Sequence, residues 1–153
     1  MAIHIIQHGL VDLHSHYFNE TLAWRQTLQD AGKAFHIYGH ANLSQALARE
    51  TGAIPAFRLA PDSRMEMNPK FAPLADFIDG AEILADDFVR VLGGRLGERD
   101  IVVVPCATER DLFSVALWLA RTRPVCPPDW PSSFMVLTCP GRSRPIAGCY
   151  RAT

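Results

Sequence analysis

The sequence lacks a Cys-x-x-Cys pair, an apolar run near the ~20 residues that span a bilayer, and an excess of charge of either sign. The first absence argues against a zinc ribbon, and the second against a membrane-spanning helix. Fifteen Lys and Arg residues against sixteen Asp and Glu residues leave a net charge of −1, which argues against a general nucleic-acid binder. The first residues show no basic segment of a signal peptide, so we expect a cytoplasmic protein with Cys106 and Cys139 as reduced, structural thiols.

Glycine-rich phosphate-binding motifs are also missing. The chain contains neither Gly-x-Gly-x-x-Gly nor a P-loop, and the first predicted strand-to-helix turn has one glycine, Gly9. We therefore predict no bound cofactor.

Five short apolar segments predict strands: residues 3–7, 34–38, 54–58, 101–104 and 134–138. The fourth, Ile-Val-Val-Val, is continuously apolar, as expected for a parallel strand that is covered on both faces.

Helical spacing of apolar residues lies between these strands and predicts helices over residues 19–31, 44–51, 74–92 and 108–121. Asn19 and Ser44 are the expected N-caps of the first two, and Thr108 with Asp111 approximates a capping box for the fourth. Leu112, Val115 and Leu119 are the expected buried face of that fourth helix.

Alternation of strands and helices predicts the α/β class. The expected architecture is a Rossmann-like open parallel sheet of about five to six strands with helices on both faces. It would occupy residues 1–138, and residues 139–153 form an irregular C-terminal tail without periodicity.

Ligands of open parallel sheets bind outside the carboxyl ends of the strands. The segment after the first strand is the richest in polar side chains, and all six histidines lie within the first forty residues. His16 or His14 is the predicted general base, oriented by Asp12, because histidine titrates near neutral pH. The predicted substrate contacts, all at strand ends or helix starts, are His8, Gly9, Asn19, His40, Thr108 and Glu109.

The His14-x-His16 spacing also suggests a metal-dependent hydrolase, since it resembles the metal motif of amidohydrolases. Such sites need further ligands from later strands, and no histidine follows His40. Only Cys106, Glu109 and Cys139 remain near later strand ends, so we predict no metal site and keep the hydrolase as an alternative.

The run from His16, Tyr-Phe-Asn-Glu-Thr-Leu-Ala-Trp-Arg-Gln-Thr-Leu-Gln-Asp-Ala-Gly, resembles the opening of bacterial GT-B glycosyltransferases, as does the strand that follows it. Residues 100–120 resemble a later part of the same N-terminal domain. The resemblance implies a Rossmann-like acceptor-side domain that contributes to sugar transfer onto a small-molecule or glycan acceptor. It also implies a separate donor-binding domain that this chain does not contain, which leaves open whether the chain is an enzyme alone.

A non-catalytic binding or oligomerisation module is the other alternative. A sheet edge left uncovered could pair with a second copy, which would make the protein a homodimer.

Overall fold

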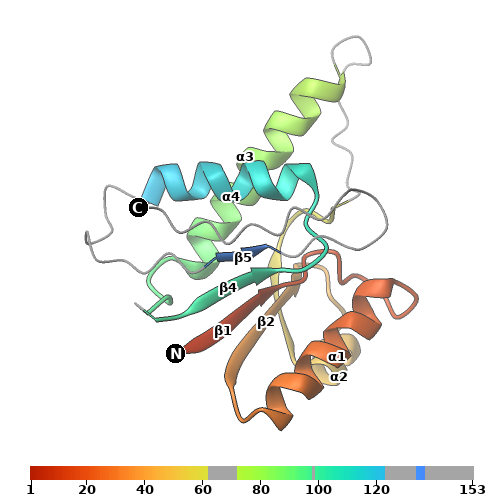
Figure 1. Ribbon diagram of the computed structural model, residues 1–153. Coiled ribbons are helices and arrows are strands. Elements are labelled where there is room, and N and C mark those ends of the chain that lie inside the picture. Colours follow the sequence, from red (N-terminus) through yellow and green to blue (C-terminus); the bar gives the residue numbers. More distant parts are fainter. Residues whose placement is uncertain (62–71, 98, 123–133, 137–153) are drawn as a thin grey trace.

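The structure is a computed structural model that describes residues 1–61, 72–97, 99–122 and 134–136 (Figure 1). The elements follow one another as β1 (Ala2–Ile6), α1 (His16–Asp30), β2 (Ala34–His40), α2 (Gln45–Thr51), β3 (Ala53–Phe57), α3 (Ala72–Leu92), β4 (Ile101–Val104), α4 (Glu109–Thr122) and β5 (Phe134–Val136).

The strands form one parallel sheet in the order β3-β2-β1-β4-β5, in which β5 is only three residues long. Strand β1 is central, with Ile5 opposite Ile37 of β2 on one side and Val103 of β4 on the other. The predicted α/β class and parallel sheet are confirmed, and the order is that of a Rossmann-like sheet. The predicted tail, residues 139–153, lies outside the described residues.

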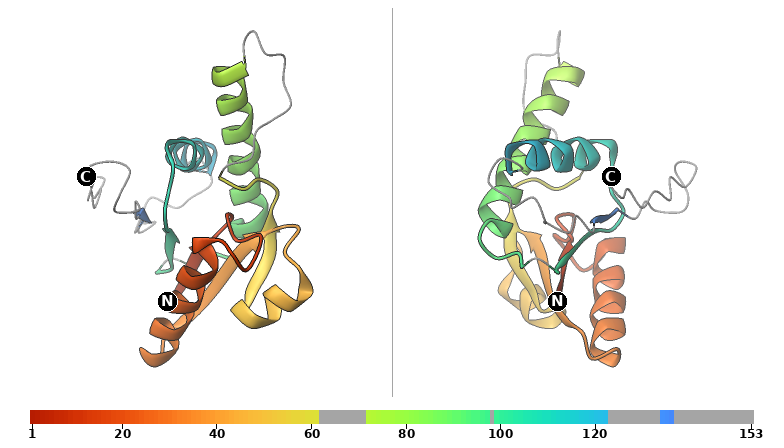
Figure 2. Two further views of the ribbon diagram at one scale, coloured as in Figure 1. Left: turned by 90° about the vertical axis from the view of Figure 1, so that its right-hand side faces the viewer. Right: turned by 60° about the vertical axis from the view of Figure 1, so that its left-hand side comes forward.

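Helices cover both faces of the sheet, as Figures 1 and 2 show. One apolar cluster joins Ile5 and Ile37 to Leu28 of α1 and Leu47 of α2. A second cluster lies on the opposite face and contains side chains of α3 and α4, listed with their strand partners here: Ile6, Tyr38, Phe57, Leu84, Phe88, Val104, Val115 and Trp118. The successive residues Ile5 and Ile6 of β1 thus enter different clusters, as the pleat of a strand requires.

Two predictions about the helices are wrong. Helix α1 begins at His16 after the N-cap Ser15, so Asn19 is an exposed residue inside the helix and not its cap. In α4, Leu112 is exposed, contrary to the prediction, whereas Val115 is buried and Leu119 packs against the core as predicted. Asp111, Ser114 and Trp118 are buried as well. The buried face is rotated because α4 places Asp111 against the end of the sheet and Trp118 against Phe88, 5.1 Å away between ring centroids.

The connections reverse direction at β1. From β1 the chain moves through β2 to β3 at one edge, and it then crosses to β4 on the other side of β1. The segments after β1 and β4 therefore diverge at one point of the carboxyl edge, where Rossmann-like domains bind their ligands. None of the helices in the described ranges combines the length and apolar character that a bilayer crossing requires.

Candidate functional site

The polar cluster at this switch point is built around His8, the second residue after β1. Its Nδ1 lies 2.9 Å from the carbonyl oxygen of Leu59, and its Nε2 lies 2.8 Å from Oδ1 of Asp111. Both side chains are at most 5% exposed. The imidazole thus joins the end of β1 to the segment after β3 and to the first turn of α4.

Both ring nitrogens of His8 face oxygen acceptors, so the arrangement favours the doubly protonated imidazolium. Burial lowers the pKa of His8, but the Asp111 carboxylate and the hydrogen bonds to Asp111 and Leu59 outweigh burial and raise it above 6.5. Neither nitrogen is left to contact a ligand, so the predicted role of His8 in substrate binding has no free donor or acceptor on the ring.

Asp111 is held ionised by the same contacts. Burial raises its pKa. The charge of His8, the hydrogen bond from His8 and the two hydrogen bonds from Thr108 outweigh burial and lower the pKa below the usual 3.8. Oδ2 accepts hydrogen bonds from Thr108 N at 2.7 Å and from Thr108 Oγ1 at 2.9 Å. The capping box predicted for α4 is therefore present, and the Thr108 hydroxyl is engaged in it. Oδ1 is buried with no other hydrogen-bond partner among the described residues, so its charge depends on His8.

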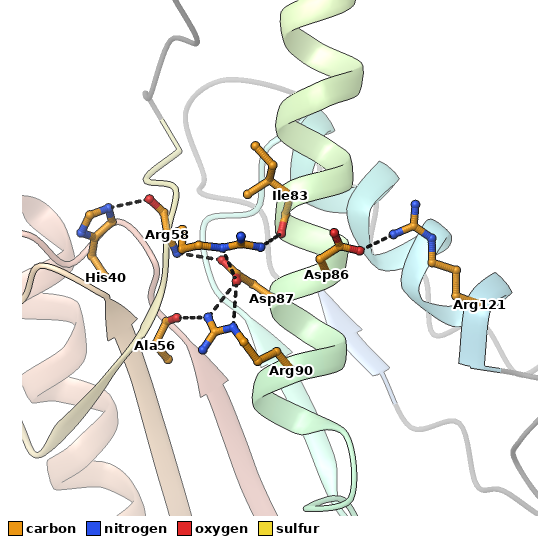
Figure 3. A network of polar contacts seen from close by, with 8 residues as sticks. All are labelled: His40, Ala56, Arg58, Ile83, Asp86, Asp87, Arg90 and Arg121. Carbon is orange, nitrogen blue, oxygen red and sulfur yellow. Dashed lines mark hydrogen bonds and ion pairs between the residues drawn. The ribbon is translucent and has the colours of Figure 1, made fainter.

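His40, at the end of β2, lies at the same edge of the sheet, because β1 and β2 are neighbouring parallel strands. It is buried, with Nε2 3.2 Å from the carbonyl oxygen of Arg58 and Nδ1 accepting a hydrogen bond from Asn42 N at 3.1 Å. Figure 3 shows the contact of His40 with Arg58. His40 therefore binds the backbone of the segment that follows β3, as His8 does through Leu59.

The same segment is anchored to α3 by a buried carboxylate (Figure 3). Asp87 has no exposed surface, and its Oδ2 accepts from Arg58 N at 2.7 Å. Its Oδ1 accepts from Arg58 Nε at 2.8 Å and from Arg90 Nη2 at 2.7 Å, and Arg90 also donates to the carbonyl oxygen of Ala56. This network positions the segment that follows β3, whose carbonyl groups at Arg58 and Leu59 in turn contact the two histidines.

The three predicted catalytic residues lie on the exposed part of the loop between β1 and α1. Asp12, His14 and His16 are all exposed. Asp12 Oδ1 accepts hydrogen bonds from the backbone of His14 at 2.8 Å and of Ser15 at 2.9 Å, so the carboxylate orders the loop that carries both histidines. The ring of His16 packs on that of Tyr17, with centroids 3.9 Å apart.

Gly9 belongs to the same loop and lies against the ring of Tyr17. A Cβ at position 9 would clash with that ring, so the observed packing favours glycine. Of the other predicted contacts, Asn19 and Glu109 are exposed on the first turns of α1 and α4. Because no ligand contact identifies them, their substrate roles stay predictions.

Sequence reasoning missed the most buried polar residue of the switch point, Gln7, which directly follows β1. Gln7 Nε2 donates to Glu20 Oε2 at 3.1 Å, and Cys106 Sγ, which follows β4, lies 3.5 Å from the same oxygen. A glutamine at the end of an apolar strand, beside a histidine, was the signal available in the sequence. Cys106 is disulfide-bonded, which corrects the expectation of a reduced thiol, and the other three cysteines lie outside the described residues.

Metal ligands do not gather in the described part of the chain, where no group of three or more His, Cys, Asp or Glu side chains could hold an ion. The His14-x-His16 pair thus has no third ligand within these residues. Comparison with known proteins found no matching family model, no similar curated protein and no similar solved structure.

Proposed function

We propose that this chain is the acceptor-side domain of a glycosyltransferase-like protein and binds a neutral, hydroxyl-rich acceptor at the switch point between β1 and β4. The observation that carries the proposal is the strand order, which brings the polar loops after β1 and β4 together at one edge. The resemblance of the residues from His16 onward to GT-B glycosyltransferases names the acceptor class.

The charges at this edge favour a neutral ligand over a phosphate. Glu109 occupies the first turn of α4 and Glu20 lies near the start of α1, whereas the charge of Asp111 is matched by His8. Carboxylates there oppose a bound anion, although helix N-termini otherwise attract one. A hydroxyl group can donate to carboxylates, so an uncharged acceptor suits the site.

His14 and His16 are the proposed bases for removing the proton of the acceptor hydroxyl. Their exposure leaves the rings accessible, and Asp12 holds the backbone on which both stand. The proposed function assigns Asp12 the positioning of this loop.

Titration of the ¹⁵N-labelled protein with neutral methyl glycosides tests binding. We expect saturable amide shifts in residues 8–16 and 106–109 with at least one glycoside, and an absence of shifts with all of them would contradict the proposal. With the glycoside that binds and a nucleotide-sugar donor, replacing His14 and His16 by alanine should lower transfer by the whole protein about 10²-fold or more. His36→Ala, which removes an exposed histidine of β2, is the matched control.

A non-catalytic assembly module remains the second candidate, supported by a different observation. The N-terminal half of α3 extends past α4 and away from the sheet (Figures 1 and 2), and it exposes Leu74 and Ile78, with Phe113 exposed on α4. Light scattering separates the two candidates, since a concentration-dependent dimer that Ile78→Lys abolishes would favour assembly.

A further inference from the structure

Three side chains from three separate segments of the chain meet beside the predicted acceptor site. Gln7 follows β1, Glu20 belongs to the second turn of α1, and Cys106 follows β4. Gln7 Nε2 donates to Glu20 Oε2 at 3.1 Å, while Cys106 Sγ lies 3.6 Å from Oε1 and 3.5 Å from Oε2. The cluster therefore lies at the ends of β1 and β4, the two neighbouring strands at which the chain connections reverse direction.

Gln7 has one unmatched atom. The side chain is completely buried, and Oε1 has no hydrogen-bond partner within the described ranges. A buried acceptor without a partner costs about 1–3 kcal/mol. Turning the amide over would place Oε1 against the Glu20 carboxylate, so the observed orientation satisfies Glu20 and leaves Oε1 in need of a donor.

The negative charge of Glu20 has no positively charged partner among the described residues. The side chain is half-buried, and among the described residues no Arg, Lys or His lies within ion-pair distance of its carboxylate. Cys106 Sγ has no proton to donate because it is disulfide-bonded. Among the described residues of this cluster, hydrogen-bond acceptors thus outnumber donors.

The backbone of Cys106 adds an independent sign of function. Its φ is 52°, and it is the only residue other than glycine with positive φ in the described part of the chain. Non-glycine residues in this left-handed region are uncommon, and such conformations concentrate at ligand sites.

We propose that Glu20 and Gln7 form the hydroxyl-recognition subsite of the acceptor site, which binds two adjacent hydroxyl groups of a neutral sugar. One hydroxyl donates to the half-buried Glu20 carboxylate. The next supplies the donor that Gln7 Oε1 lacks, which requires the side chains that cover this buried atom to move aside when the sugar binds. The positive end of the α1 dipole lies one turn before Glu20 and disfavours a cationic ligand there. This inference rests on the proposed function, because it names the contacts of the same acceptor.

Binding of the methyl glycosides to Glu20→Gln and Gln7→Leu tests the subsite. Loss of a charge-assisted hydrogen bond should weaken binding by Glu20→Gln about tenfold or more, and Gln7→Leu should weaken it about fivefold. Gln7→Leu removes the unmatched acceptor and also the donor to Glu20, two changes of opposite sign, so its thermal midpoint should lie close to that of the wild type. Glu50→Gln, an exposed glutamate of α2, should bind as the wild type does.

The outcomes separate the two proposals. If no glycoside binds the wild type, the proposed function fails and the subsite fails with it. If a glycoside binds the wild type and both variants with the same affinity, the subsite alone is overturned. Saturable binding of methylammonium, with no glycoside binding, would show a cation site and overturn the subsite as stated.

Discussion

His8 Nε2 lies 2.8 Å from Asp111 Oδ1, and this pair is almost completely buried. It connects two segments that are more than a hundred residues apart in the sequence, at the switch point where the chain connections reverse direction. The cost of burying both charges is offset by hydrogen bonds on their remaining atoms, from Thr108 to the carboxylate and from His8 to Leu59.

Removing the charge of Asp111 should be strongly destabilising. Asp111→Asn leaves a buried imidazolium without a counter-charge, so we expect the free energy of unfolding to fall by about 3–5 kcal/mol in urea denaturation. Glu109→Gln, an exposed change in the same helical turn, should cost about 1 kcal/mol or less. Equal losses in both variants would contradict the view that the buried pair stabilises this junction.

The charge of His8 predicts a stability that declines at alkaline pH. The pKa of His8 is raised above 6.5 in the folded state, so its contribution is complete below pH 6.5 and is lost as the pH rises through the folded pKa. Asp111 has the opposite effect at acid pH, because its pKa is lowered in the folded state. Its contribution to stability is present above pH 3.8 and is lost as the pH falls through the folded pKa.

Unfolding free energies measured across this range check the pH prediction. The difference in unfolding free energy between the wild type and His8→Gln should be largest between pH 3.8 and pH 6.5, and it should decrease toward alkaline pH. In ¹⁵N spectra at pH 6, both ring nitrogens of His8 should be protonated. A single-proton tautomer at that pH would refute the assigned imidazolium.

Asp87 and its neighbour Asp86 offer a matched comparison on α3. Asp87 is buried between Arg58 and Arg90, whereas Asp86 pairs with Arg121 at 2.7 Å on the surface. Asp87→Asn should lower the free energy of unfolding by about 1.5–3 kcal/mol, because it weakens the charge-assisted hydrogen bonds that the buried carboxylate accepts, while the two half-exposed arginines stay solvated. Asp86→Asn should cost less than about 1 kcal/mol, as exposed ion pairs do. A reversed order would show that the network in Figure 3 does not anchor β3.

Asp100 should make the start of β1 sensitive to acid. Hydrogen bonds from the backbone of Ala2 and Gly97, with a further contribution from His4, hold the pKa of Asp100 at about 2 although burial opposes them. Its stabilisation is present above pH 3.8 and is lost as the pH falls toward 2. After allowance for solvent screening we expect about 1 kcal/mol, measured as the difference in unfolding free energy between the wild type and Asp100→Asn at pH 6 and pH 2. A difference that does not change with pH would contradict this assignment.

The sequence alone determined the order and type of the elements, because hydrophobic periodicity and end signals are local. Strand β4 has the predicted bounds, and Ser44 caps α2 through Leu47 N at 3.2 Å while Gly52 ends it with φ 72°. The start of α1 could not be predicted as well. Ser15 and Asn19 are both good cap residues, and the choice between them depends on how the preceding loop folds.

Tertiary structure decided what the switch-point residues do. The histidines at strand ends were visible in the sequence, but only the arrival of Asp111 and Leu59 from distant segments makes His8 a buried imidazolium. Nothing local to Gln7 or Glu20 indicates that one amide and one carboxylate will share a site with Cys106. Charge and hydrogen bonding depend on neighbours in space, whereas helix and strand formation depend mainly on neighbours in sequence, and this is why the fold was more predictable than the site.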